Sequence, residues 1–361
     1  MKEEKMISIS LCMIVKNEER VLERCLESLK GLMDEIIIVD TGSTDKTKKI
    51  AEKYTNKIYD FKWIDDFSAA RNFSFSKATK EYIYVADADE VLDHDNYEKF
   101  KKLKQVLLPE IDIVQMYYCN QLEFNTTYNY DKEYRPKLYK RLRQFIWKNP
   151  IHECVQIEPI IYDSEIAIMH KPENNHGTRD FAAFQRMIAR GETLSAHLHN
   201  MYARELFIAG EAKDFLEAET FFKKSITEQR STDEWKEANA VLVHCAKLKG
   251  DKFTFFKHAM KDIVENPCSE VCCELGAFYV EQEDFEEASN WYYNAIQNVK
   301  AILNIRYQEE IPKEGLRFCY EKLEECAEKS GQKQLAMEYN KARKDLDGIV
   351  TDVGVNMPHE L

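Results

Sequence analysis

The sequence has few of the residues that interrupt or cross-link a chain. Only 11 glycines and 8 prolines are spread over 361 residues, and no Gly-, Ser- or Pro-rich linker separates two parts. The 10 cysteines follow no regular spacing and form no C-x-x-C pair, which argues against a zinc ribbon or a thioredoxin-type centre. Such cysteines are typical of a reducing compartment, where they serve mainly as small buried hydrophobes.

Long apolar runs are also missing. The longest early run, residues 7–15, is interrupted by serines and falls short of the roughly 18 residues that a membrane span requires. No small-residue cleavage site follows it. We therefore expect neither a signal peptide nor a transmembrane segment, and we expect a cytoplasmic location.

Basic residues are outnumbered by acidic ones. The chain has 51 lysines and arginines against 64 aspartates and glutamates, which gives a formal net charge of −13. This balance argues against nucleic acid as a partner, but it leaves room for a small anionic ligand held by a few local cations and a metal. The length suggests two globular domains.

The first half of the chain alternates short apolar runs with amphipathic helices. We expect strands at 7–15, 35–40, 81–86, 111–118 and 166–169, and helices at 19–32 and 45–54. Apolar strands that alternate with helices predict an α/β domain, over residues 1–177, whose mostly parallel sheet is covered on both faces.

The second half, residues 178–361, shows no strand pattern and contains an internal repeat. The segment DFLEAETFF at 214–222 recurs as DFEEASNWY at 284–292. Gly276, Ala288 and Tyr292 have the offsets of a tetratricopeptide repeat, in which small residues let helices approach and aromatic residues fill the groove between hairpins. We expect an all-α, tetratricopeptide-like scaffold after a helical linker, with a homodimer as one possible use. An ordinary helical bundle is the alternative.

Polar clusters follow three of the predicted strands, at residues 14–18 (IVKNE), 39–45 (VDTGSTD) and 85–90 (VADADE). Because ligands of open α/β sheets bind beyond the carboxyl ends of the strands, these clusters are expected at one edge. Asp87 and Asp89 are the most informative pair. At a strand end they can address a sugar or ribose hydroxyl and a divalent cation, and Mg²⁺ and Mn²⁺ prefer carboxylate oxygen.

The loop at 40–45 reads as a capped turn between a strand and a helix. Gly42 permits the turn and Ser43 can cap the helix. A capped turn does not explain Asp40, which we assign to a base or ribose contact. Farther along, Arg71 and Asn72 are expected to leave a helix face packed through Phe67, Ala70 and Phe73. Arginine suits phosphate.

A basic island at 135–143 (RPKLYKRLR) is followed by His152 and Glu153, either of which could serve as a general base. His170 and His176 come next. Each could be a metal ligand beside the Asp pair or a structural histidine.

Together, the motifs at 10–19, 38–47, 66–72, 86–90 and 151–153 resemble the ordered motif set of family-2 glycosyltransferases with the GT-A fold. The resemblance covers residues 7–177. With its helical repeats the chain resembles the bacterial subgroup that carries a tetratricopeptide tail, and it is similar to the peptide S-glycosyltransferases of sublancin-type glycocin biosynthesis.

The resemblance implies inverting transfer from a nucleotide-diphosphate sugar, with UDP-glucose as the first choice. Asp40 would contact the base, Asp87 the ribose or sugar, and Asp89 the Mn²⁺ or Mg²⁺, with His170 or His176 as a further ligand. Glu153 would be the acceptor base, with His152 as second choice. The remaining donor-binding positions would be Val15, Asn17, Glu18, Gly42, Ser43, Arg71, Asn72 and Ala88. Thr41 replaces the second aspartate of the usual motif, so any role of that residue is lost.

The acceptor implied by the resemblance is a peptide or protein, through a Cys thiol or Ser hydroxyl of a bacteriocin precursor. The alternatives are a cell-envelope saccharide or lipid-linked acceptor, and a catalytically silent tetratricopeptide adaptor. A nucleotidyltransferase would also pair Asp with a metal, yet the sequence has no glycine-rich phosphate loop or Walker pattern.

Overall fold

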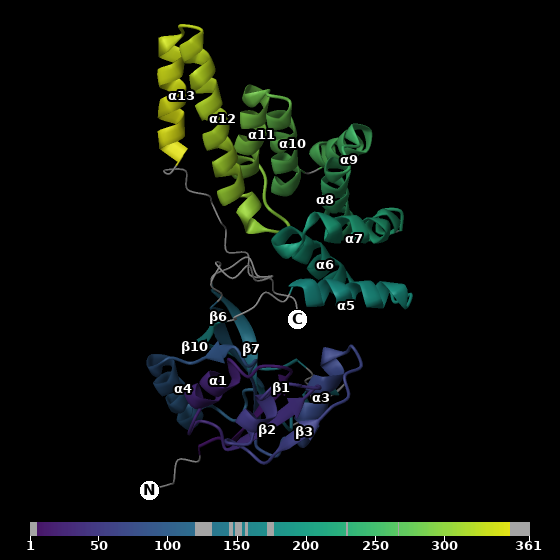
Figure 1. The fold of residues 1–361 in the computed structure, drawn as a ribbon. Coiled ribbons are helices and arrows are strands. Elements are labelled where there is room, and N and C mark those ends of the chain that lie inside the picture. Colours follow the sequence, from purple (N-terminus) through teal and green to yellow (C-terminus); the bar gives the residue numbers. More distant parts are fainter. Residues whose placement is uncertain are drawn as a thin grey trace. The chain divides into compact units, whose positions relative to one another are not determined.

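The computed structural model describes residues 6–119, 132–143, 147–148, 154–155, 158–171, 177–228, 230–265 and 267–346. The chain divides into two compact units, Met1–Asn175 and His176–Leu361. The first contains the sheet and the second is helical (Figure 1).

The first unit is built on one eight-stranded sheet with the order β3-β2-β1-β4-β7-β6-β10-β5. Its strands are β1 (Ile9–Val15), β2 (Glu35–Asp40), β3 (Ile58–Asp60), β4 (Tyr82–Val85), β5 (Glu90–Val91), β6 (Ile113–Cys119), β7 (Lys132–Lys140) and β10 (Ile161–His170). The strands β3, β2, β1 and β4 are parallel, as are β6 and β10, and β7 runs antiparallel between β4 and β6. β8 (Trp147–Lys148) and β9 (Cys154–Val155) form a separate pair. The predicted α/β class with a mostly parallel sheet is confirmed.

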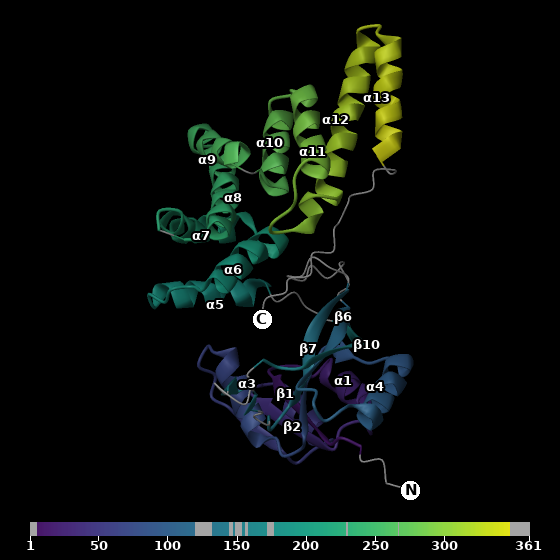
Figure 2. The ribbon, with the colours of Figure 1, turned by 180° about the vertical axis from the view of Figure 1, so that it is seen from behind.

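Helices cover both faces of this sheet (Figures 1 and 2), which explains why the central strand β1 is buried at nearly every position. Leu11 and Met13 of β1 pack in one core with α1 (Leu22–Ser28) and α4 (His94–Val106). Cys12, between them, points into a second core with α3 (Phe67–Lys77). Alternate residues of a strand face opposite sides, so a strand buried on both faces needs apolar residues at every position.

The sequence-based bounds differ from the structure mainly in the helices, at their starts and at their ends. α1 begins at Leu22 rather than Glu19, because Asn17 adopts a left-handed backbone conformation (φ 58°) and the chain turns there before the helix. α2 (Thr47–Ala51) is likewise shorter than 45–54. The expectation that Phe67 packs on the helix face is wrong: it is 47% exposed in the first turn of α3, edge-on to Trp63.

The second unit contains nine α-helices in the described residues. They are α5 (Gly177–Ala189), α6 (Ala196–Ala209), α7 (Ala212–Ser225), α8 (Thr232–Leu248), α9 (Lys252–Glu265), α10 (Ser269–Glu281), α11 (Phe285–Gln297), α12 (Glu310–Lys329) and α13 (Lys333–Asp345). Both copies of the repeated segment begin near the start of a helix, at the N3 position of α7 and at the N-cap position of α11. Asp214 completes a capping box at the start of α7, and Asp284 caps the start of α11. No helix among the described residues is long and apolar enough to cross a membrane.

Tyr292 shows why the repeat needs small residues. Its ring lies between Gly276 of α10 and Gly315 of α12, where an added Cβ would come within 2.8 Å and 2.5 Å of the ring, respectively. Heavy atoms cannot approach that closely, so a side chain at either position would displace the ring. The predicted division between small and aromatic positions therefore holds at this contact.

Candidate active site

The loops after β1 and β2 are joined by hydrogen bonds. The backbone N–H of Asn17 donates to Ser43 Oγ (2.9 Å), and the N–H of Thr44 donates to Asn17 Oδ1 (2.8 Å). The N–H of Glu18 donates to Thr47 Oγ1 (2.7 Å). Asn17 and Ser43 are both predicted to bind a ligand. In the structure they join the two loops at the carboxyl edge of the sheet.

Asp40 ends β2 and is only 1% exposed. Its Oδ1 accepts hydrogen bonds from the backbone N–H groups of Gly42 and Ser43, both at 2.9 Å. Gly42 has φ 106°, a conformation that glycine adopts without steric cost. Oδ2 has no hydrogen-bond partner among the described residues. A buried carboxylate oxygen without a donor is ready to accept one from a ligand.

The turn that carries the Asp pair follows β4. The N–H of Glu90 donates to the carbonyl of Asp87 (3.2 Å), and the N–H of Lys171 donates to the carbonyl of Asp89 (2.9 Å). His170 lies opposite Glu90 in the ladder between β10 and β5, and its Nε2 is 3.0 Å from Asp89 Oδ2. Residues far apart in sequence are therefore brought together, as the metal-ligand hypothesis for His170 requires.

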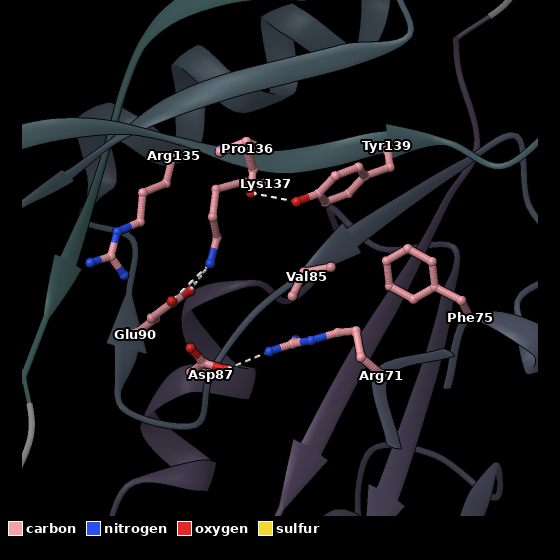
Figure 3. A pocket seen from close by; sticks show the side chains of 9 residues that line it. All are labelled: Arg71, Phe75, Val85, Asp87, Glu90, Arg135, Pro136, Lys137 and Tyr139. Atoms are coloured by element: carbon pink, nitrogen blue, oxygen red, sulfur yellow. Dashed lines mark hydrogen bonds and ion pairs between the residues drawn. The ribbon is translucent and has the colours of Figure 1, made fainter. Parts of the chain in front are cut away.

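Lys137 reaches the same turn from β7. The pairing of β6 with β7 is irregular here: Val114 lies opposite Leu138 and Gln115 opposite Pro136. Lys137 is thus an extra residue, and such bulges redirect a side chain. Its Nζ donates to both carboxylate oxygens of Glu90, at 2.7 and 2.8 Å, and both side chains are almost fully buried (Figure 3).

Two arginines complete the group. Arg71 Nη2 of α3 is 3.5 Å from Asp87 Oδ1, while its buried Nη1 has no hydrogen-bond partner among the described residues. The Arg135 guanidinium lies over the Tyr118 ring, 3.7 Å from its centroid. In Figure 3, Lys137 reaches down to Glu90 from the strand above it, and Arg71 points to Asp87 from the right.

These side chains line a cavity of about 390 Å³. The lining residues are Arg71, Phe75, Val85, Asp87, Glu90, Arg135, Pro136, Lys137 and Tyr139. Three of them are cations and two are carboxylates, so the cavity has an excess of positive charge in a chain whose net charge is −13. An anionic ligand is favoured at such a place.

The surroundings shift the pKa values of the Asp87 and Glu90 carboxyl groups in opposite directions. Desolvation raises the pKa of Asp87, but Lys137, Arg71 and Arg135 outweigh it, so that this pKa lies below its usual value. Burial raises the pKa of Glu90 to about 7, against the opposing charge of Lys137. Asp87, half exposed to the cavity, is therefore the permanent anion of the pair.

The structure gathers only part of the predicted site. Arg71, Asp87, Asp89 and His170 lie around the turn after β4, while Asp40 and its loop lie at the ends of β1 and β2. Asn72 is exposed. Val15 and Ala88 are 2% and 5% exposed, so their side chains pack in the core. His152, Glu153 and His176 lie outside the described residues.

Sequence reasoning gave no role to Lys137, Glu90 or Arg135 individually. The basic island contained Lys137 and Arg135, but only the strand order reveals that β7 lies directly beside β4. The bulge that aims Lys137 has no signal of its own in the sequence.

Carboxylate oxygen suits both Mn²⁺ and Mg²⁺, whereas imidazole nitrogen suits transition metals rather than Mg²⁺, so Asp89 and His170 together fit Mn²⁺ better than Mg²⁺. The buried His170 Nδ1 has no hydrogen-bond partner in the described parts of the chain. Within those parts, no group of three or more His, Cys, Asp and Glu side chains is arranged to hold a metal. A metal bound there would therefore need further ligands, such as the phosphate oxygens of a bound anion.

Comparison with known proteins finds a family match for the first half of the chain. Residues 10–189 match the protein family described as Glycosyl transferase family 2. The chain is 33% identical over 171 residues to the SPbeta prophage-derived glycosyltransferase SunS of Bacillus subtilis, which covers 44% of this chain and 36% of SunS. It is 51% identical over 87 residues to a TPR repeat-containing protein of Synechococcus elongatus, covering 24% of this chain and 22% of that protein. The chain thus spans about a fifth to a third of the length of these two relatives.

A further relative and two solved structures extend the comparison. The lipopolysaccharide core biosynthesis glycosyltransferase LpsC of Rhizobium meliloti is 31% identical over 109 residues, 29% of this chain and 37% of LpsC. Glucosyl-3-phosphoglycerate synthase from Mycobacterium tuberculosis has a TM-score of 0.36 at 13% identity, over 52% of this chain and 82% of that one. S. aureus TarS 1-349 has a TM-score of 0.32 at 13% identity, over 80% and 91%. At these scores the structural likeness carries no argument about the reaction.

Proposed function

Because residues 10–189 of this chain belong to glycosyl transferase family 2, we propose that the protein is an inverting, metal-dependent glycosyltransferase. It moves a hexose from a nucleotide-diphosphate sugar, with UDP-glucose as the first donor to test. The observation that carries this proposal is the positively charged cavity beside Asp87 and Asp89, at the carboxyl end of β4. A diphosphate is the anionic part of such a donor.

The nucleoside would lie along the ends of β1 and β2. Asp40 Oδ2 accepts an N–H of the base, which gives a partner to an oxygen that has none among the described residues. Asp87 accepts a hydroxyl of the ribose or sugar, and Arg71 orients the Asp87 carboxylate. The joined loops of Asn17 and Ser43 hold this edge in place before the donor arrives, which lowers the entropy lost on binding.

The diphosphate would occupy the cavity. Arg71 presents Nη1, which has no hydrogen-bond partner within the described parts of the chain, and Arg135 and Lys137 of β7 add further positive charge. Asp89 and His170 would hold the Mn²⁺ or Mg²⁺, and His176 is the alternative. When bound, the metal supplies Lewis-acid stabilisation of the leaving diphosphate. The arginines and Lys137 stabilise the same developing charge and fix the donor for in-line attack.

The acceptor would be a peptide or protein that attacks through a Cys thiol or a Ser hydroxyl, with a bacteriocin precursor as the first substrate to test. Glu153 takes the proton of the attacking group, with His152 as the second candidate. The assignment of Glu153 or His152 as the acceptor base rests on the sequence motif. We also propose that the protein is cytoplasmic and forms a homodimer. A cell-envelope saccharide is the second candidate acceptor, favoured by the similarity to LpsC.

A donor-hydrolysis and binding screen tests the proposal. The purified chain is incubated with UDP-, GDP- and dTDP-sugars, with Mn²⁺ or with EDTA, and nucleotide release is measured. Asp89→Asn is the test variant. Asp95→Asn, an exposed carboxylate in the first turn of α4, is the matched control.

Metal-dependent release of one nucleotide, lost in Asp89→Asn and kept in Asp95→Asn, supports the proposal and identifies the donor. Absence of binding for every nucleotide sugar overturns it and favours an adaptor built on the helical repeats.

A further inference from the structure

One helix of the second unit exposes a line of apolar side chains. Phe253 is 81% exposed, Val264 82% and Met260 48%. All three belong to α9, and their spacing of seven and four residues puts them on one side of the helix. Figures 1 and 2 show α9 lying against α8 at the outer side of the helical unit.

The other side of α9 makes the packing contacts. Phe255, His258, Ala259 and Asp262 are buried, and Phe255 stacks on Phe278 of α10, with ring centroids 5.3 Å apart. The helix is therefore anchored through one face, and the line of Phe253, Met260 and Val264 points to solvent.

Two lysines lie among these apolar residues: Lys257 is four residues after Phe253, and Lys261 directly follows Met260. Lys257 and Lys261 are exposed, and neither has an acidic partner among the described residues. Nearby lysines of the same unit behave differently, since Lys223 and Lys249 both pair with Glu219. The exposed side of α9 thus combines protruding apolar groups with uncompensated positive charge in an acidic chain.

We infer that this side of α9 docks on an anionic lipid surface. The apolar side chains enter the boundary between headgroups and acyl chains, and the lysines meet the negative headgroups, which is how basic amphipathic helices lie on membranes. Charge complementarity selects an anionic surface.

This inference does not depend on the proposed transfer reaction, since docking is measured without donor or acceptor. The test is flotation of the full chain with vesicles of phosphatidylcholine and phosphatidylglycerol in equal parts, beside vesicles of phosphatidylcholine alone. The variants are Phe253→Ser/Val264→Ser and Lys257→Glu/Lys261→Glu. The matched control is Met337→Ser/Lys341→Glu on α13, where Met337 is 73% exposed.

We expect the native chain to float with the mixed vesicles. Each α9 variant should lower the partition coefficient about tenfold or more, and the control should not change it. Added salt should weaken the binding, because screening shortens the reach of the lysines. Circular dichroism melting shows whether each variant is folded, which is expected because the substituted side chains are exposed.

Three results would overturn the inference. The native chain could fail to float with anionic vesicles, or the α9 variants could float as well as the native chain. Alternatively, sedimentation could show self-association that is lost in Phe253→Ser/Val264→Ser without vesicle binding, which would assign the face to a second copy of the chain.

Discussion

Both units bury charged side chains, but they use them differently. In the helical unit, His199 is fully buried between Glu237 and Ser225, with both ring nitrogens 2.7 Å from an oxygen. Glu270 accepts hydrogen bonds from the backbone N–H groups of three successive residues, 302–304. These polar groups satisfy one another, and such networks specify packing.

In the sheet unit, incompletely satisfied charged groups meet at the carboxyl edge of the strands. Asp40 Oδ2, Arg71 Nη1 and His170 Nδ1 are buried atoms without a hydrogen-bond partner among the described residues. Asp40 and His170 end β2 and β10, and Arg71 reaches from α3 to Asp87, which follows β4. The helical unit has such atoms as well, but they lie on three different helices: Arg204 Nε on α6, Asp262 Oδ1 on α9 and Glu274 Oε2 on α10. The difference shows that buried charge alone does not mark a site. A cluster whose members still lack partners, next to a cavity, is the sign of a ligand.

The largest expected effect comes from the same substitution in both units. Asp89→Asn should lower transfer about a hundredfold or more, because it removes a ligand of the proposed metal. Asp262→Asn, at a buried aspartate of α9, should leave turnover at the native value. Steady-state turnover with the donor found in the screen compares the two. Equal losses in both variants would contradict the division of roles.

Among the substitutions of buried charged residues, the largest loss of stability is expected in the helical unit. Glu237→Ala leaves His199 and Asn200 without the carboxylate that both contact. Breaking a buried charged network costs about 3–5 kcal/mol, which urea unfolding followed by circular dichroism would measure. Lys213→Ala, at an exposed i,i+4 pair, is the control and should change stability by less than about 0.5 kcal/mol. A loss below 1 kcal/mol for Glu237→Ala would be inconsistent with a network that specifies packing.

Lys137→Met sharpens the comparison within the sheet unit. It removes the cation that pairs with Glu90 and should weaken donor binding about tenfold or more. Its effect on stability should be smaller than that of Glu237→Ala, because the raised pKa of Glu90, about 7, lets this carboxyl take up a proton. Calorimetric donor binding and urea unfolding of Lys137→Met, beside Lys137→Met/Glu90→Gln, check both effects. Unchanged donor affinity would remove Lys137 from the site.

A smaller effect is expected from substituting the proposed acceptor base, and its size should depend on the acceptor. Glu153→Ala should reduce turnover less with a thiol acceptor than with a hydroxyl acceptor, because a free thiol with a pKa of roughly 8.5 needs less help to lose its proton. Matched peptides that differ only in Cys or Ser provide the measurement. Equal losses with both peptides would count against Glu153 as the base.

In the native chain, the smallest effect is expected for the pH dependence of stability in the helical unit, because two opposing contributions nearly cancel. Burial lowers the pKa of His258 from 6.5 to about 4, with smaller contributions from lysines including Lys257 and Lys261. Burial also raises the pKa of Asp262 from 3.8 to about 6. As the pH falls from 6.5 to 4, the unfolded chain protonates His258 before the folded chain does, which destabilises the fold. Over the same range Asp262 takes up its proton first in the folded state, which opposes the loss.

The two groups should therefore nearly cancel in the native chain. In Asp262→Asn only His258 of this pair still titrates. The free energy of unfolding of this variant should therefore fall by up to about 3 kcal/mol between pH 6.5 and 4. Adding His258→Gln should abolish that fall. Urea unfolding at several pH values measures it, and a flat profile for Asp262→Asn would show that His258 is not buried as a neutral ring.

The sequence predicted the α/β class and the strands that carry Asp40 and Asp87, because apolar runs that end in polar clusters depend only on local pattern. It could not predict the pairing of Lys137 with Glu90, which depends on β7 entering the sheet beside β4. Helix starts were also misplaced, since the left-handed turn at Asn17 has no clear local signal. The packing of Tyr292 against Gly276, in contrast, followed from the spacing of the repeat.

The most direct test of the account is calorimetric titration of UDP, in the presence of Mn²⁺, into the native chain, Lys137→Met and Glu237→Gln. The account predicts weaker binding for Lys137→Met at nearly native stability. Glu237→Gln should bind UDP with native affinity although its melting temperature is lower. Native affinity in Lys137→Met, or equal losses of affinity in both variants, would contradict the claim that only the unsatisfied charges of the sheet unit serve a ligand.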